Sequence, residues 1–213
     1  MINNLELIKT LIDFPNEDTF YKVEVIIRRK DNPGLLSNTK LVKTYYITSA
    51  EKLDLLFEKE IKPICDVLNA RASFYLNKRS FEKTAFASLK QTVDCIMTHD
   101  YKAVKRAYNS ACGKTCNGGD DKRWLFDLDE KDEETVKLIK KFVEIVSGKV
   151  YAVIPTKHGY HVITSVFNLQ NFWHMLEVNI AAEPSNTRLL TIQKMDIHKD
   201  NGTILYIPDN ENE

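Results

Sequence analysis

The sequence predicts a mixed α+β fold with an antiparallel hairpin in each half of the chain. In the first half, residues 21–30 and 41–48 are strand-like, and a turn-forming Asp-Asn-Pro-Gly segment separates them. In the second half, residues 149–156 and 160–167 form a comparable pair around a Lys-His-Gly turn. The helical patterns around these hairpins do not alternate regularly with strands, so we expect the α+β class rather than a βαβ series.

The first helix is predicted over residues 5–14, where Asn3 or Asn4 supplies a side chain that can cap its start. A second helix is expected over residues 50–68.

Thr48 and Glu51 form a capping box at the start of that second helix. Proline lacks a backbone N–H and clashes with the preceding turn, so Pro63 should kink or divide the helix. Residues 70–77 alternate again and predict a third strand.

A longer helix is predicted from Ser80 to about Thr98, followed by a shorter one over residues 100–110. The segment 112–122 contains three of the seven glycines and is the clearest break in the chain. The longer helix is expected to place one apolar face against the core: Phe81, Ala85, Leu89 and Val93.

The second half begins with a predicted strand over residues 122–129 and a helix over 133–146, which Asp129 or Asp132 can cap. A short helix is expected over 168–176. The tail then holds three β-prone runs between turn-forming residues, namely EVNIAA, RLLTIQ and TILYIP.

Composition limits the class of protein. The 213 residues are 43% hydrophobic and 28% charged, as in an average globular domain, and the net charge is zero. No apolar run is long enough to span a membrane, the N-terminus does not resemble a secretory signal, and four cysteines do not make a disulfide scaffold. We therefore expect an intracellular, cytoplasmic protein with no membrane partner.

Charge is unevenly distributed between the two halves. Residues 1–119 carry 19 basic and 14 acidic side chains, whereas residues 120–213 carry 11 basic and 16 acidic ones. This difference permits a metal site beside a track for a polyanion, and it equally permits two halves that simply attract one another.

The segment RWLFDLD carries the strongest chemical signal. Side chains alternate along a strand, so Trp124, Phe126 and Leu128 should face a core while Asp127 and Asp129 face the other way. Two neighbouring carboxylates repel each other unless protons, water or cations compensate. They suit Mg²⁺ or Mn²⁺, but acids before a helix also serve as ordinary helix-start residues.

A second signal is His161, which follows the glycine turn of TKHGYHVIT. If the strand over 122–129 pairs with this hairpin, the imidazole comes close to the two aspartates. An imidazole there can hydrogen-bond a phosphate oxygen.

This order of features resembles the archaeo-eukaryotic primase superfamily, which includes the primase-polymerases. Phe126-Asp127-Leu128-Asp129 corresponds to the first motif, and the segment 156–161 stands for the second. The second motif is usually Ser-x-His, whereas here Thr156 lies five residues before His161. Ser110-Ala111-Cys112-Gly113 and Lys122-Arg123-Trp124 resemble the approach to the first motif in phage-type members.

The resemblance implies a two-module core: a basic α/β module over residues 1–119 and an RRM-like, metal-binding module over residues 120–213. It implies a nucleotidyltransferase that adds nucleotides from triphosphates on a single-stranded template, with replication proteins as possible partners. By the same resemblance Asp127 and Asp129 bind Mg²⁺ or Mn²⁺, and a later acid completes the metal site. Asp196 is the first candidate for that third ligand and Glu177 the second.

The resemblance assigns His161 to the triphosphate, and Lys157 and Arg123 are the other candidate nucleotide ligands. For the template, the basic residues on or after the third strand are candidates: Arg71, Lys78 and Arg79. The basic run Arg28-Arg29-Lys30 suits either a nucleic-acid backbone or an exposed hairpin tip.

Two alternatives remain open. The chain can be a catalytically weak or inactive relative that binds nucleic acid or nucleotide within a replication assembly, or a metal-dependent nuclease in which the same acids activate water. Cys112 and Cys116 have C-x3-C spacing, but no second ligand pair for zinc lies nearby, and Cys65 and Cys95 are expected in the core.

Overall fold

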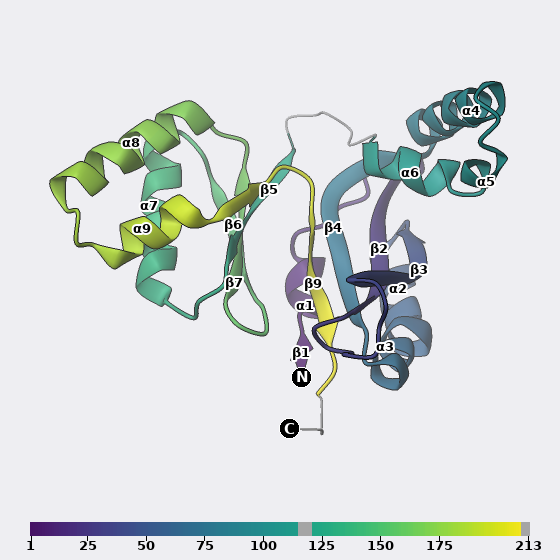
Figure 1. Cartoon of the computed structure of the whole chain (residues 1–213), viewed down its shortest axis with the longest axis horizontal. Helices are drawn as coiled ribbons and strands as arrows, with labels where there is room; N and C mark the ends of the chain where they lie inside the picture. The colour runs from purple at the N-terminus through teal and green to yellow at the C-terminus, as the bar shows by residue number, and fades with distance from the viewer. Residues whose placement is uncertain (115–120, 210–213) are drawn as a thin grey trace.

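The computed structural model describes residues 1–114 and 121–209. It is a mixed α+β structure in which two antiparallel sheets lie side by side, with helices on their outer faces (Figure 1). The predicted α+β class is confirmed. Within the described residues, no helix is long and apolar enough to cross a membrane.

The larger sheet has five strands in the order β1-β9-β4-β2-β3, with every neighbouring pair antiparallel. The predicted first hairpin is its β2–β3 pair. The strands are β1 (Ile2–Asn3), β2 (Thr19–Arg28), β3 (Thr39–Ile47), β4 (Arg71–Ser80) and β9 (Gly202–Ile207).

Helices from the N-terminal half surround this sheet. Its outer face is covered by a helical stretch that the sequence placed at 50–68. That stretch is divided by a π-helical turn just before Pro63, which gives the proline ring the room that a regular helix would deny it. The elements are α1 (Leu5–Lys9), α2 (Ala50–Leu56), the π-helix η1 (Phe57–Ile61), α3 (Lys62–Leu68), α4 (Phe81–Met97), α5 (Tyr101–Val104) and α6 (Ala107–Lys114).

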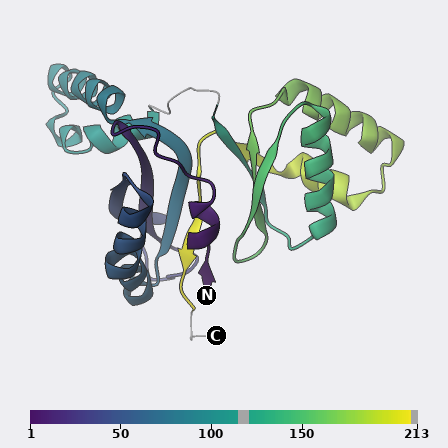
Figure 2. The same ribbon diagram turned by 180° about the vertical axis from the view of Figure 1, so that it is seen from behind.

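The smaller sheet has four antiparallel strands in the order β6-β7-β5-β8, and its helices pack on the face turned away from the larger sheet (Figure 2). The chain order is β-α-β-β-α-β with the second helical position filled by two helices, which is a split βαβ arrangement. The elements are β5 (Arg123–Leu128), α7 (Glu133–Ile145), β6 (Val150–Pro155), β7 (Tyr160–Ser165), α8 (Leu169–Ala182), α9 (Thr187–Lys194) and β8 (Asp196–His198).

The tail corrects part of the sequence interpretation. EVNIAA continues α8, and RLLTIQ forms α9, so these two runs are helical and only TILYIP is a strand. Asn186, part of the predicted turn, caps α9 by accepting hydrogen bonds from the backbone N–H groups of Arg188 and Leu189. A short apolar run fits either period, and here the cap and the packing decide for a helix.

Strand β5 separates two hydrophobic cores, as its alternation predicts. Phe126 and Leu128 are fully buried against α7, α8 and α9, whereas Leu125 belongs to the core of the larger sheet together with Ile154 and Ile163. The two sheets therefore share apolar contact along one part of their interface.

Beyond that contact, a polar junction joins the two modules. Arg79 at the end of β4 is fully buried and donates to the Cys112 carbonyl at 2.6 Å, to the Asn77 carbonyl at 2.7 Å and to Asp200 Oδ2 at 2.8 Å. Asn77 donates to Asp200 and exchanges two hydrogen bonds with the backbone of Arg123 at the start of β5. The junction ties the end of β4, the start of β5 and the turn before β9 together.

We expect Arg79→Met to lower the free energy of unfolding by about 3–5 kcal/mol, because it removes the Arg79 hydrogen bonds to Asp200 Oδ2 and to two buried carbonyls. Urea unfolding followed by circular dichroism measures the change. Arg29→Met, at an exposed position, is the matched control and should stay within about 0.5 kcal/mol of the parent protein. Equal effects of the two substitutions would contradict a structural role for the junction.

Candidate functional site

The aspartates and the histidine singled out by the sequence meet on the face of the smaller sheet that turns toward the larger one. Asp127 pairs in register with His161 on β7 and with Asp196 on β8, so three candidate residues form one row across three adjacent strands. Asp127 and Asp129 come from the end of β5 and the residue after it. The strand pairing on which the His161 hypothesis depended is confirmed.

Asp127 and Asp129 do not cap the helix that follows them. Asp132 caps α7 by accepting from the Glu134 N–H at 3.0 Å and the Thr135 hydroxyl at 2.9 Å, and Arg188 lies 2.9 Å from it. These partners lower the pKa of Asp132 to about 2, with the Arg188 contact as the largest cause. Asp127 and Asp129 are therefore free of the capping role.

His161 connects the two sheets. Its Nδ1 lies 2.9 Å from the Thr203 hydroxyl on β9, and its Nε2 lies 3.3 Å from Asp127 Oδ1. Only 10% of the His161 side chain is exposed, so the ring lies between Thr203 and Asp127 rather than projecting into solvent. The His161 contact lowers the pKa of Asp127 below its ordinary value and outweighs the opposing effect of burial, which keeps Asp127 a carboxylate at neutral pH.

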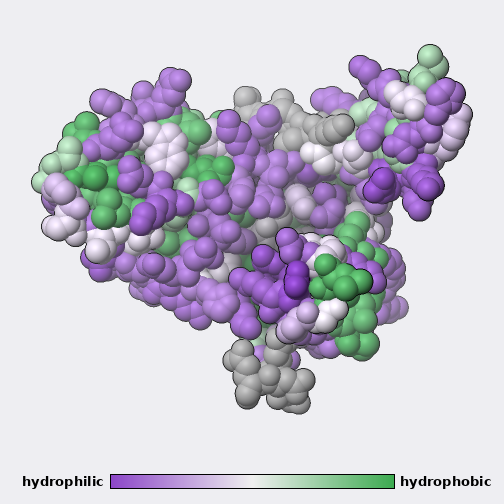
Figure 3. Space-filling view, viewed as in Figure 1, coloured by the Kyte–Doolittle hydropathy of each residue, from purple (hydrophilic) through white to green (hydrophobic). Residues whose placement is uncertain are grey.

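A cavity of about 420 Å³ opens between the sheets beside this row. Asp127, Asp129 and His161 form one wall. Basic side chains from the larger sheet, from the loop after β2 and from the β6–β7 turn also line it: Arg28, Lys30, Arg71, Lys157 and His158. The surface over the region between the sheets is mainly hydrophilic (Figure 3).

Acidic residues gather in a second cavity, of about 250 Å³, on the other side of the same aspartates. Asp127, Asp129, Glu130 and Asp196 line it together with Lys194. Asp127 and Asp129 therefore stand at the boundary between a basic space and an acidic one, which is where the basic first half of the chain meets the acidic second half.

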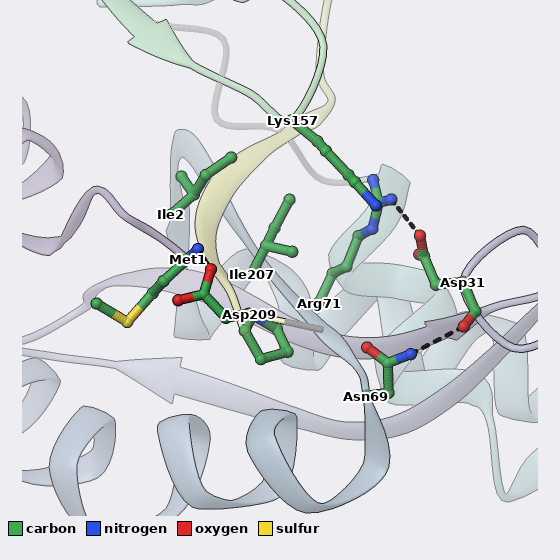
Figure 4. A pocket seen from close by; sticks show the side chains of 9 residues that line it. Met1, Ile2, Asp31, Asn69, Arg71, Lys157, Ile207 and Asp209 are labelled. Carbon is green, nitrogen blue, oxygen red and sulfur yellow. Dashed lines mark hydrogen bonds and ion pairs between the residues drawn. The ribbon is translucent and has the colours of Figure 1, made fainter. Parts of the chain in front are cut away.

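Lys157 reaches from the β6–β7 turn toward the ion pair of Arg71 and Asp31 in a smaller cavity of about 190 Å³ (Figure 4). Arg71 donates to Asp31 Oδ1 at 2.6 Å, and both side chains are nearly buried. Because Arg71 and Lys157 also line the larger cavity, two cations from different sheets face the same space.

Gly159 sets the distance between the β6–β7 turn and the end of β5. A Cβ atom built on it would lie 1.9 Å from the Leu128 carbonyl oxygen and 2.7 Å from the Glu130 nitrogen. Thr156 closes the turn, since its hydroxyl accepts from the Gly159 N–H and its own N–H donates to the Gly159 carbonyl. Only glycine leaves room for the backbone that carries Asp129.

Other predicted site residues lie away from the cavity. Arg123 stacks its guanidinium 3.8 Å from the centre of the Tyr151 ring at the opposite end of β5. Lys78 forms ion pairs with Asp13 and Asp121, and Arg79 belongs to the buried junction with no exposed surface. Glu177 is an exposed residue of α8 that lines neither cavity. The structure thus separates Arg71 from the other proposed template ligands.

Sequence reasoning missed the partners that complete the site. Thr203 is a buried strand residue in TILYIP, and nothing in its local pattern marks it as the contact of His161. Arg28 and Lys30 were visible as a basic run, but their position opposite Asp127 follows only from the packing of the two sheets. Cys116 lies outside the described residues, and Cys112 is fully buried.

Comparison with known proteins adds no constraint. No family model, no curated protein and no solved structure matches the chain. The function therefore has to be argued from the site itself.

We expect Gly159→Ala to lower the free energy of unfolding by about 2 kcal/mol or more, because backbone atoms of the β5 end must move to admit the methyl group. Thermal and urea unfolding measure the effect. Gly34→Ala is the matched control, since no atom of the described residues lies within 4 Å of a Cβ there, and it should be neutral or slightly stabilising. A neutral result at Gly159 would contradict the close approach.

Proposed function

We propose that the chain is a metal-dependent nucleotidyltransferase of primase-polymerase type, which adds nucleotides from triphosphates on a single-stranded template. The observation that carries the proposal is the row Asp196–Asp127–His161 at the edge of a cavity whose opposite wall is basic. Phosphoryl transfer needs few covalent partners from the protein. It needs carboxylates for a cation, and cations around the phosphates.

The strand order of the smaller sheet supports the same proposal. The resemblance leads us to expect an RRM-like sheet that carries the first motif. β5 is central in the order β6-β7-β5-β8, and the hairpin that brings His161 is its neighbour. The larger sheet with its basic residues would then be the module that faces nucleotide and template.

The donor set fits Mg²⁺ or Mn²⁺ bound together with substrate. Asp127 and Asp129 are hard oxygen ligands at the boundary between the two cavities, and Mg²⁺ is commonly held by one or two carboxylates plus substrate phosphates. Across residues 1–114 and 121–209, however, no group of three or more His, Cys, Asp or Glu side chains is arranged to hold an ion by itself. Such an ion, when bound, would polarise the phosphate oxygens and neutralise their charge.

The remaining side chains have distinct roles in the proposed reaction. Lys157, Arg71 and Arg28 would hold the triphosphate, while His161 fixes the orientation of Asp127 through its contact with Thr203. A 3′-hydroxyl would attack the α-phosphate in line, and pyrophosphate would leave. Arg28, Arg29 and Lys30 also line a neighbouring open cavity, where a template backbone could follow the first hairpin.

One observation favours a second candidate function. Because the described residues hold no three-ligand cation site, the chain could be a relative that binds nucleotide or single strands with little or no catalysis. Titration with Mn²⁺ and a labelled triphosphate separates the two. Binding of single strands without metal-dependent triphosphate binding would favour the second candidate.

We expect the double substitution Asp127→Asn with Asp129→Asn to reduce template-directed nucleotide incorporation at least about 100-fold, because it removes both carboxylates at the cavity boundary. The melting temperature should shift by less than about 4 °C, the change expected for about 1 kcal/mol in a chain of this size. A primer-extension assay and a thermal melt measure the two effects.

The matched control for that variant is Glu133→Gln with Glu134→Gln, which alters two acids in the first turn of the neighbouring helix, away from both cavities. It should retain incorporation. The same assay without triphosphates tests for metal-dependent cleavage of the strand. Full synthesis by the Asp127/Asp129 variant would contradict the proposal, and cleavage without synthesis would identify a nuclease.

We expect Asp196→Asn to weaken Mn²⁺-dependent triphosphate binding several-fold, since Asp196 pairs with Asp127 and lines the acidic cavity. Glu177→Gln is the matched control, because Glu177 is exposed on α8 and should leave binding unchanged. Isothermal titration with a non-hydrolysable triphosphate measures both. Loss of binding in Glu177→Gln alone would assign the third ligand to α8 instead.

A further inference from the structure

Helix α4 turns its most apolar face toward solvent, whereas a surface helix usually turns that face toward the core. Its apolar residues are exposed: Phe86 (68%), Leu89 (60%), Val93 (49%), Ile96 (48%) and Met97 (76%). We call Phe86, Leu89, Val93 and Ile96 the α4 stripe. The sequence analysis expected Leu89 and Val93 against the core, and the structure places them in solvent.

Apart from Phe81 at its start, which stacks on Phe20, the side of α4 that packs carries small or polar residues. Thr84 is buried, and Gln91 donates from its side-chain amide to the Ser110 hydroxyl on α6 at 2.9 Å. Cys95 on the same side is half-buried. Among the residues that the structure describes, helix packing therefore uses the less apolar face of α4 and leaves its most apolar face exposed.

The spacing of the stripe indicates what covers it. Its residues follow intervals of three, four and three positions, which is the a/d pattern of a coiled-coil seam. A narrow stripe of this period fits another helix better than a sheet or an extended peptide. The intervals are the same from either end of the helix. The stripe can therefore pair with a second copy of itself in antiparallel orientation.

We propose that two copies of this chain associate through antiparallel packing of their α4 helices. Phe86 of one copy then lies opposite Ile96 of the other, and Leu89 lies opposite Val93, with a two-fold axis level with residue 91. Such an isologous contact uses the same surface on both copies.

The position of α4 permits this contact. It projects with α5 and α6 from one end of the larger sheet, at the extremity of the molecule and away from the smaller sheet, in both views (Figures 1 and 2). Because α4 begins directly at the end of β4, a parallel pair would bring the two β4 ends to the same place, whereas an antiparallel pair keeps the two bodies apart.

The exposed area is comparable to the apolar part of a standard dimer interface. The stripe and Met97 together expose roughly 500–600 Å² of apolar surface per copy, against about 800 Å² in total per partner of a standard interface. About two thirds of a homodimer interface is apolar, so the stripe supplies the apolar core and the flanking polar residues, such as Lys90, supply the rim.

The first test is the oligomeric state of the full chain by sedimentation velocity over a concentration series. We expect the parent protein to dimerise reversibly and Phe86→Glu with Leu89→Glu to raise the dimer dissociation constant at least about 10-fold, without loss of helical circular dichroism. Val67→Glu, at a valine of α3 that is 83% exposed, is the matched control and should dimerise like the parent.

The second test fixes the orientation by lysine-specific cross-linking of a mixture of isotope-labelled and unlabelled copies. Lys90 flanks the axis, so a Lys90–Lys90 link between copies is expected, whereas Lys83 should face the far end of the partner helix and give no Lys83–Lys83 link. A parent protein that stays monomeric at about 100 µM would overturn the proposal and leave the stripe to a helix of another protein. A dimer that the glutamate variant does not weaken would also overturn it.

Discussion

The buried junction around Arg79 is the constraint on which the site depends. The candidate site has one wall on each sheet, so its geometry is only as well defined as the relative position of the sheets. Arg79 and Asn77 fix that position at one end of the interface by binding backbone atoms of three separate segments. A buried guanidinium with three partners has little freedom to move, because each lost contact leaves a buried polar group unsatisfied.

A second polar link holds the sheets at the other end. Asn4 donates from its side-chain amide to the carbonyls of Pro155 on β6 and Ile204 on β9, at 3.0 and 2.9 Å. Between these two links, apolar contact through Leu125 and Ile163 gives way to the polar row of Asp127 and His161, which lie on the same face of their strands. The cavity therefore adjoins a packed interface, and it begins where the apolar side chains between the two sheets give way to polar ones.

The placement of charge follows from this arrangement. The excess of basic residues in the first half and of acidic residues in the second faces across the cavity, with Arg28 and Arg71 on one side and Asp127 and Asp129 on the other. Under the proposed function, such a space would attract a ligand that carries both a polyanion and a cation, as a metal-bound triphosphate does. The α4 stripe lies outside this system, so association of two copies would leave each cavity open.

The sequence by itself determined the α+β class, both hairpins and the alternation that sends Phe126 and Asp127 to opposite sides of one strand, because these features follow from local periods and turn residues. It also singled out Asp127, Asp129 and His161 as candidate site residues, because carboxylates and an imidazole beside turns can be recognised from the local sequence. Only the tertiary structure decided that Thr203 holds His161, that Arg28 faces Asp127, that Arg79 is interior and that Leu89 is exposed. These contacts depend on which surfaces of the two sheets meet. The local sequence around a residue does not show which distant residue will pack against it.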